Sequence, residues 1–538
     1  MLLRGTATVS ILTLLSRVLG FVRDLLVAKL LGASLFADAF FVAFRIPNLL
    51  RSFVAEGALT SAFVPVFSSI LARDQDEAFL SFRRVLGFLI FLTTPLTLLG
   101  IFFSPEIVDF LAPGFSQDQE KWHLCTSLTR IMMPYIACVS VIAMINSALN
   151  ALHIFGASAW AQVTMNLVLI VGALLAITTD PNTSTFILSY SVLLGGIIQI
   201  VVQVPTCLRT GLSLVPSFSI LSRDVAEIVS LMVPATLGAS VYQLTIFIAT
   251  LLASMLPSGS VSWLFYADRV AQFPIGIFSV ALASVLLPAL STASARADTD
   301  AFQQRLGDSL RFTSFVIIPM AAGIWELALP ITQLLFERGA FSHESSIMTS
   351  YALKALAVGL WATSCHSMVV RAFIAKKDTL TPTIIGIVSL IVTVLASLLL
   401  MGPITTPSGA IAVWLQGLQS LLYSLISTRV AFGHWGLATA SSVSAFCSLI
   451  LILSLFSLKL GRFPWRSFAA STIRSLLAAL CMVVALKLYV PYASSAIVAC
   501  LVGIPLAAAT YGLTSFLLRS PECEETLRMV RRASQRNR

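Results

Sequence analysis

Long apolar runs recur from one end of this chain to the other, and short polar segments separate them. A helical run of 18 or more apolar residues satisfies its own backbone hydrogen bonds in lipid, whereas an outer-membrane barrel would need alternating segments of about ten residues. The pattern therefore predicts an all-α polytopic membrane protein. The predicted helices lie at about 6–33, 36–70, 79–104, 122–152, 156–178, 184–208, 229–256, 260–293, 306–336, 345–375, 382–402, 409–431, 437–460, 468–490 and 494–518.

The polar segments alternate in charge. "LARDQDEAFLSFRR" and "RAFIAKKD" contain arginine and lysine, whereas "TTDPNTST" and "LPSGSVS" contain neither. Because basic loops stay in the cytoplasm, the N-terminus is predicted to be cytoplasmic. Fifteen spans would then place the tail "RMVRRASQRNR" outside, and fourteen would place it inside. We therefore expect about 14 spans and a cytoplasmic C-terminus, with 409–431 as the run that does not cross fully.

An internal repeat divides the chain. "GALTSAFVPVFSSILARDQDEAF" (57–79) aligns with "VALASVLLPALSTASARADTDAF" (280–302) at a constant offset of 223. Six predicted helices per repeat give two lobes of the same orientation, an architecture of transporters whose binding site forms at the lobe interface. The predicted parts are an N-lobe at 1–210, an amphipathic linker at 211–228, a C-lobe at 229–435, C-terminal helices at 436–518 and a basic cytoplasmic tail at 519–538. The linker's polar residues fit an interfacial helix or a simple polar loop.

Composition agrees with a membrane protein and narrows the chemistry. The chain of 538 residues is 57% hydrophobic and 11% charged, and its net charge of +10 fits basic cytoplasmic loops better than nucleic-acid binding. The eight cysteines lie in apolar runs without paired spacing. The sequence has no nucleotide-binding Walker motif and no metal-ligand cluster. We therefore expect no metal and no cofactor.

Several arginines lie inside the apolar runs. At 1.5 Å per residue, Arg17 is roughly 16 Å into the first helix, and Arg23, Arg51 and Arg269 also lie within predicted spans. Each arginine at the bilayer centre costs about 2.5–3.5 kcal/mol on insertion scales, so these side chains must face water, counter-charges or a polar ligand. Arginine binds phosphate oxygens in bidentate geometry, which favours an anionic ligand.

Acidic and polar residues near these arginines complete the candidate set. Asp38 and Asn48 lie along one stripe of the second helix with Arg45, and Asp24 shares a face with Arg17. In the alternative interpretation, Arg17, Arg23 and Arg51 form fixed salt bridges. Their partners would be Asp24, Asp38 and Glu56. In either interpretation, Lys29 and Arg45 fit pairing or snorkelling residues better than ligand contacts.

The motifs "SRVLGFVRDLLVA", "DAFFVAFRIPNLLR", "AEGALTSAFVPVF", "GSVSWLFYADRVAQFPIGIFSVALASVLLPALS" and "APGF" resemble the MurJ/MviN lipid II flippases of bacterial inner membranes. The resemblance implies the fold of the multidrug/oligosaccharidyl-lipid/polysaccharide exporter superfamily, with a central cavity between the lobes and a lipid-tail groove on the last two helices. The family's essential cavity arginines correspond to Arg17, Arg23, Arg51 and Arg269. The resemblance places Asp38 and Asn48 at cavity positions. Supporting ion pairs would use Asp24, Asp268 and Glu56. Many relatives have "NLLRR" where this chain has Arg51-Ser52.

The resemblance implies a non-enzymatic flippase that moves undecaprenyl-diphosphate-linked disaccharide pentapeptide to the outer leaflet by alternating access. A membrane potential or ion gradient would drive it, as a monomer, with membrane lipids and cell-wall synthesis proteins as partners. One alternative is an ion-coupled exporter of another lipid-linked glycan or a small molecule, whose cavity would be dominated by acidic residues. Another is an enzyme acting on the same lipid carrier. Its catalytic acids would have to come from Glu106, Asp109, Asp118 and Glu120, which fit a solvated loop.

Overall fold

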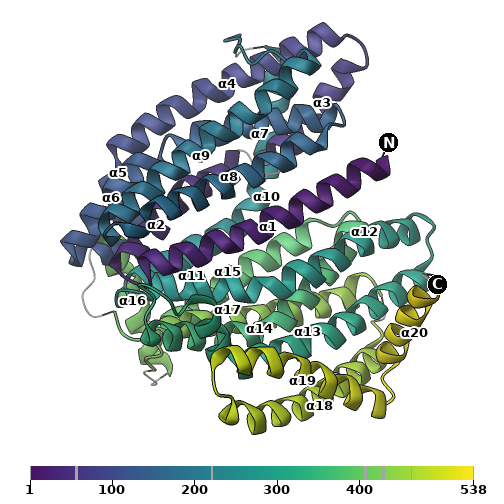
Figure 1. The fold of residues 1–538 in the computed structure, drawn as a ribbon. Helices are drawn as coiled ribbons and strands as arrows, with labels where there is room; N and C mark the ends of the chain where they lie inside the picture. The colour runs from purple at the N-terminus through teal and green to yellow at the C-terminus, as the bar shows by residue number, and fades with distance from the viewer. Residues whose placement is uncertain are drawn as a thin grey trace. The chain divides into compact units, whose positions relative to one another are not determined.

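The computed structural model describes residues 2–54, 58–219, 222–404, 409–426, 430–461 and 463–536, and it leaves out the side chains of 2–10, 50–54, 58, 234–242, 426 and 529–536. These residues are almost entirely helical, which confirms the predicted all-α membrane fold (Figure 1). Two compact units divide the chain. The first comprises 1–262, 338–342 and 405–416, and the second comprises the rest.

The first unit is built mainly from the helices that precede residue 262. Their bounds are α1 (Leu2–Leu31), α2 (Leu35–Val54), α3 (Ala58–Leu71), α4 (Gln75–Phe102), α5 (Ser104–Leu111), η1 (Pro113–Gln117), α6 (Gln119–Met132), α7 (Tyr135–Ala151), α8 (Phe155–Leu175), η2 (Ala176–Thr178), α9 (Pro181–Thr210) and α10 (Arg223–Ser254).

The second unit contains most of the remaining helices. Their bounds are α11 (Ser260–Pro274), the π-helical turn η3 (Ile275–Ser279), α12 (Val280–Ala295), α13 (Thr299–Phe336), α14 (His343–Ala375), α15 (Leu380–Leu400), α16 (Gly409–Ile426), α17 (His434–Lys459), α18 (Trp465–Tyr489), η4 (Val490–Tyr492), α19 (Ala496–Leu517) and α20 (Pro521–Arg536).

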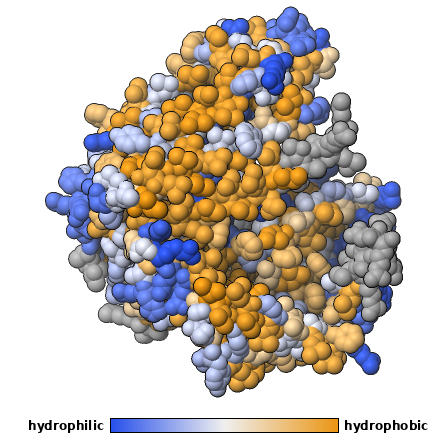
Figure 2. Space-filling model, viewed as in Figure 1, coloured by the Kyte–Doolittle hydropathy of each residue, from blue (hydrophilic) through white to orange (hydrophobic). Residues whose placement is uncertain are grey.

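Exposed apolar stripes mark the lipid-facing sides of the helices. On α9, the exposed side chains of Tyr190, Leu194, Ile197 and Val201 recur at helical spacing. Figure 2 shows broad apolar areas on the visible face, with hydrophilic residues gathered toward its margins. In the described chain, eleven helical segments are long and apolar enough to cross a membrane. The expected total of about 14 spans requires crossings by α1, by α2 with α3, and by α10, which carry charges or breaks and are not among these eleven.

The first unit extends beyond the predicted lobe boundary at residue 229. Its core joins α3, α4 and α7, with Phe63, Phe67 and Phe82 fully buried. Helix α10 packs against α2, α3 and α4, so it belongs to this unit although it follows the first repeat in sequence. The sequence repeat and the packing boundary therefore fall at different places.

The predicted linker is a chain segment lying on α4. Gly211 ends α9 with a left-handed φ of 82°, residues 212–219 are not helical, and α10 begins at Arg223. Ser217 donates its backbone N–H to the Arg83 carbonyl at 2.9 Å, and Arg83 Nε donates to the Val215 carbonyl at 2.9 Å. A Cβ atom at Gly87 would overlap the Ser217 carbonyl. Of the two interpretations of the linker, these residues fit the loop.

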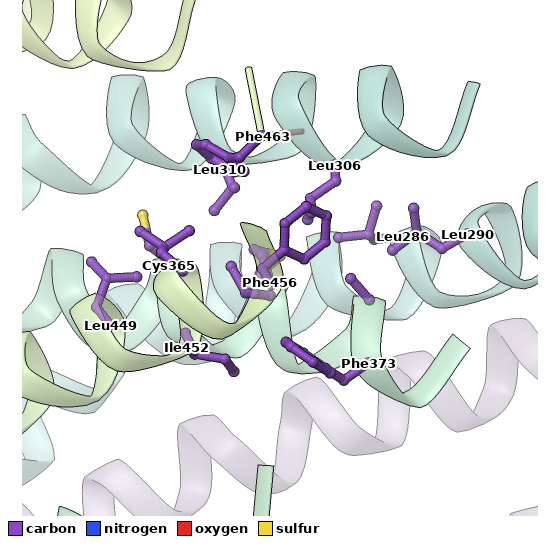
Figure 3. Close-up of a cluster of buried hydrophobic side chains, with 14 of the residues drawn as sticks. Leu286, Leu290, Leu306, Leu310, Cys365, Phe373, Leu449, Ile452, Phe456 and Phe463 are labelled. Carbon is purple, nitrogen blue, oxygen red and sulfur yellow. The ribbon is translucent and has the colours of Figure 1, made fainter. Parts of the chain in front are cut away.

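In the second unit, α14 is surrounded by α12, α13 and α17. Figure 3 shows their shared core, in which Leu286, Leu306, Phe373 and Phe456 point toward one another. Helices α18 and α19 pack side by side and against α13 (Figure 1). The last two long helices thus pack against a helix of the second repeat but are not part of that repeat.

The residues that flank 402–430 lie next to each other, at the end of α15 and just before α17. Met401 and Ala431 form an antiparallel bridge, and the Phe432 N–H donates to the Leu400 carbonyl at 2.9 Å. Deeper in the pair, the Ser389 and Ser444 hydroxyls lie 2.8 Å apart, so α15 and α17 run antiparallel. The 18-residue α16 is about 27 Å long, but it lies within an excursion that begins and ends at one end of this pair. This excursion therefore adds no net crossing between α15 and α17, which agrees with the prediction that 409–431 does not cross fully.

Candidate functional site

A polar cluster joins the middle of α1 to α8. Arg23 donates from Nε and Nη2 to Asp24 Oδ1 at 2.9 and 2.7 Å, and from Nη1 to Asn166 Oδ1 at 3.0 Å. Asn166 donates in turn to the Ser16 carbonyl at 3.0 Å. Only 15% of the Arg23 side chain is exposed, whereas Arg17 is exposed. The guanidinium of Arg23 is thereby held in one orientation by a carboxylate and an amide.

The sequence interpretation had missed Asn166. The available signal was one amide in the apolar run "TMNLVLIVGALL", where an asparagine without a partner would be unfavourable in lipid. Asp24 was predicted to share a face with Arg17. Asp24 forms an ion pair with Arg23, whose guanidinium also donates to Asn166.

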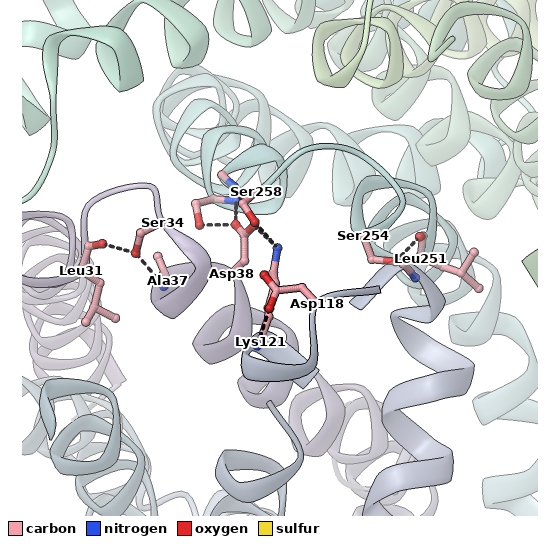
Figure 4. A network of polar contacts seen from close by, with 12 residues as sticks. Leu31, Ser34, Ala37, Asp38, Asp118, Lys121, Leu251, Ser254 and Ser258 are labelled. Atoms are coloured by element: carbon pink, nitrogen blue, oxygen red, sulfur yellow. Dashed lines mark hydrogen bonds and ion pairs between the residues drawn. The ribbon is translucent and has the colours of Figure 1, made fainter. Parts of the chain in front are cut away.

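Asp38 lies in a second, fully buried network at the start of α2 (Figure 4). Its Oδ2 accepts hydrogen bonds from Lys121 Nζ and the Gly259 N–H, both at 2.8 Å. Its Oδ1 accepts from the Ser262 N–H at 2.9 Å and the Ser262 hydroxyl at 2.6 Å. The Lys121 ammonium also lies 4.2 Å from the ring centroid of Phe115. In this conformation Asp38 joins α2, α6 and the α10–α11 connection and has no surface open to a ligand.

The remaining predicted residues of α2 are only partly described. Asn48 donates to the Phe44 carbonyl at 2.9 Å, one turn earlier and beside Pro47. Arg45 donates to the Thr250 hydroxyl of α10. The side chain of Arg51 and all of Glu56 lie outside the described residues.

Asp268 and Arg269 lie on α11, in the second unit. Asp268 is exposed and accepts a hydrogen bond from Gln272. The Arg269 guanidinium lies 5.0 Å from the ring centroid of Phe265, one turn earlier. This cation–π contact stabilises a partly buried charge without neutralising it.

Two matching loops hold the ends of α1 and α10. A Cβ atom at Gly114 would overlap the Ser254 carbonyl at the end of α10, and a Cβ atom at Gly339 would overlap the Lys29 carbonyl near the end of α1. The Ala340 N–H donates to the same Lys29 carbonyl at 2.9 Å. Each loop thus contacts the first helix of the other repeat, and glycine permits the close approach.

The predicted site residues that the structure describes include several arginines. Arg17 and Arg23 lie on α1 of the first unit, and Arg269 lies on α11 of the second. No cluster of three metal-ligating side chains occurs in the described part of the chain. Guanidinium groups in an apolar protein suit the binding of phosphate oxygens.

Comparisons with known proteins match this architecture. The family model for the lipid II flippase MurJ matches residues 27–429. A probable lipid II flippase MurJ from Vibrio cholerae is 34% identical over 84% of this chain and 82% of its own length. Another from Haemophilus influenzae is 32% identical over 89% of this chain and 91% of its own length.

Solved structures give the same result. A lipid II flippase MurJ in an inward closed conformation matches with a TM-score of 0.77 and 25% identity, over 95% of this chain and 98% of that one. An inward-facing multidrug-resistance MATE transporter of the MOP superfamily matches with a TM-score of 0.65 and 14% identity, over 82% of this chain and 94% of its own, which shows a shared fold. From the extent of the family match and of the curated relatives, we conclude that this chain belongs to the MurJ family of lipid II flippases.

Proposed function

We propose that this protein translocates lipid II, the undecaprenyl-diphosphate-linked disaccharide pentapeptide, from the inner to the outer leaflet of the bacterial inner membrane by alternating access. The observation that carries the proposal is the family match over residues 27–429, which includes the arginine-bearing helices α2 and α11 and Asn166, the α8 partner of Arg23. A diphosphate presents oxygens that guanidinium groups bind in bidentate geometry.

In this proposal, the arginines bind the diphosphate and other polar groups orient them. Arg17 and Arg269 supply guanidinium groups, and Arg51 is a further proposed contact. Arg23 is oriented by Asp24 and Asn166. Its Nη1 and Nη2 atoms each carry a second N–H, so the network leaves donor capacity for a phosphate oxygen. The apolar tail stays in lipid along α18 and α19, because hydrocarbon gains nothing from a polar site.

The proposal also covers the orientation of the protein in the membrane and the energy source for transport. Positive loops support cytoplasmic N- and C-termini, and the proposed count of 14 crossings, to which the segment at 402–430 adds none, places both termini on one side. Moving a charged lipid across the membrane couples transport to the membrane potential, about 2.3 kcal/mol per charge per 100 mV. We propose the potential, or an ion gradient, as the driving force, and a monomer as the transporting unit.

The test is transport of labelled lipid II in proteoliposomes with an imposed potential, read as accessibility to an impermeant reagent added outside. Arg17→Ala and Arg269→Ala are expected to reduce the rate roughly tenfold or more, because a hydrogen bond to a charged group contributes about 1.5–3 kcal/mol. Arg296→Ala, at the exposed end of α12, is the matched control and should transport normally. Wild-type protein that does not transport lipid II under any imposed potential would refute the proposal.

A further inference from the structure

We propose that a groove on the second unit, between α13, α14 and α17, binds an anionic glycerophospholipid of the outer leaflet. The groove has a volume of about 400 Å³, within the usual range of small-molecule sites. Its rim carries Trp325, Tyr351 and Trp435, and its apolar wall includes Val358 and Phe446. All these residues belong to one unit, so the groove is defined by that unit alone.

The groove is closed at its inner end and open at its outer end. Trp361 packs against Phe446 and stacks with Phe468 of α18, with ring centroids 6.0 and 6.3 Å apart. Toward the other end, the Trp435 ring stacks on Phe432 at 4.1 Å. Trp325 and Tyr351 are each more than 40% exposed. Aromatic side chains of this kind concentrate where a bilayer meets water, which places the open end at an interface.

Lys354 supplies the polar end of the groove. His434 Nε2 lies 2.8 Å from the Met348 carbonyl, so this turn of α14 is level with the start of α17. Lys354 lies six residues further along, about 9 Å deeper at 1.5 Å per residue. A lysine stem can follow an apolar wall and return its ammonium group toward the headgroups. The proposed topology places this end of the unit outside.

Other polar groups of the groove are already engaged. The Ser442 hydroxyl donates to the Ala355 carbonyl at 2.6 Å, and the Thr439 hydroxyl donates to the Trp435 carbonyl at 2.8 Å. Lys354, by contrast, has no hydrogen-bond or ion-pair partner among the described residues. At the same end of the unit, Lys487 lies 3.9 Å from Glu326, so that cation has its own carboxylate.

The lysine and the apolar wall together indicate which kind of lipid the groove binds. The single ammonium group of Lys354 can pair with one anionic phosphate. The apolar wall of Val358, Val443 and Phe446 suits an acyl chain. A zwitterionic lipid carries its own compensating cation and gains less from the ammonium group. The occupant is therefore a lipid with net negative charge, seated from the side of the membrane.

The groove's own tryptophans provide the measurement. Full-length protein is reconstituted in phosphatidylcholine with increasing dibrominated phosphatidylglycerol, or with dibrominated phosphatidylcholine, and bromine quenching of tryptophan fluorescence is recorded. The relative association constant of the anionic lipid should be roughly fivefold that of the zwitterionic one, the effect of about one basic residue near a membrane surface. Lys354→Ala should reduce the ratio to about one, and Lys354→Arg should retain it.

Two further variants localise the signal. Lys487→Ala removes a cation at the same end but outside the groove, and it should leave the ratio unchanged. Trp325→Phe combined with Trp435→Phe should remove most of the anionic preference, because these rings line the groove. A ratio that Lys354→Ala leaves intact, or that Lys487→Ala lowers as much, would overturn the proposal. Lipid II transport is not part of this readout, so the outcome is independent of the proposed function.

Discussion

At the residue scale, the charged side chains of the first unit include buried ion pairs and exposed cations. Asp38 and Lys121 are both almost fully buried and satisfy each other, with 1% and 4% of their side chains exposed. Arg17 remains exposed on α1 within the same unit. Burying a pair is tolerable only when every polar atom has a partner, whereas a ligand-binding cation must keep donors available. Substituting a buried charge should therefore lower the stability of the fold, whereas substituting a ligand-binding cation should lower ligand binding.

The first prediction concerns the buried pair. Asp38→Ala and Lys121→Ala should each lower the free energy of unfolding by about 3–5 kcal/mol, because each leaves a buried charge uncompensated. The double variant should lose less than the sum of the two. Denaturant unfolding in detergent measures the cycle, with Glu120→Ala, exposed and adjacent, as the control. Additive losses would show that the two groups act independently.

The second prediction concerns Asn166. Asn166→Leu should slow lipid II transport while Arg23 is still present, because Arg23 loses one of its two orienting partners. The loss should be smaller than that caused by Arg23→Ala, which removes the guanidinium itself. In Arg23→Ala protein, adding Asn166→Leu should change the rate little further. A full additional loss in the double variant would contradict a positioning role.

At the element scale, the helices follow from the sequence, but their partners do not. The apolar runs predict α9 and α15 closely, since a span of lipid-exposed residues is a local property. The run 122–152 divides into α6 and α7 around Pro134, a break that a proline makes possible but does not require. Asn166 and Lys121 meet residues more than 80 positions away, so their roles depend on packing. For the same reason the sequence does not show that Asp38, which the resemblance places at a cavity position, is buried beside Lys121 and Ser262 in this structure.

The third prediction concerns the matching loops. Gly339→Ala should lower the free energy of unfolding by about 1–3 kcal/mol or more. The new Cβ would overlap the Lys29 carbonyl, and φ at this residue is +63°. Gly114→Ala should act similarly through the Ser254 carbonyl. Gly512→Ala in α19, where nothing lies within 4 Å, should be neutral or stabilising. Equal thermal stability of all three variants would refute the close packing.

The fourth prediction concerns pH and the attachment of α20. Burial alone would raise the pKa of Glu522, but hydrogen bonds from Ser520 and Arg311 hold the pKa below its usual value. The carboxylate therefore stabilises the fold fully above the unfolded-state pKa of about 4.3, and this contribution is lost as pH falls through the lower folded-state pKa.

The difference in melting temperature between wild type and Glu522→Gln measures this contribution across pH. It should be positive at neutral pH and should shrink toward zero in acid. A difference that stayed constant down to about pH 3 would show that the charge of Glu522 is not what holds α20.

At the scale of the whole molecule, the excursion at 402–430 decides on which side the tail lies. Because the bridge between Met401 and Ala431 closes it, the excursion adds no net crossing. Replacing 403–429 with a two-residue turn should leave the C-terminus on its original side. Deleting α15 instead should reverse the sides of the helices that follow. Reporter fusions at the C-terminus measure both, and a reversed tail in the first variant would show that the excursion crosses the membrane.

The matching loops at Gly114 and Gly339 also affect how the chain inserts into the membrane during synthesis. Lys29 meets a partner loop roughly 310 residues later in the chain. At about 5–20 residues per second, that loop is made roughly 15–60 seconds after the end of α1. During this interval, a helix with four charged residues near its centre and end must wait in the membrane without its final neighbour. Co-translational insertion of this protein should therefore pass through a long-lived intermediate in which α1 is inserted but not yet held at its end.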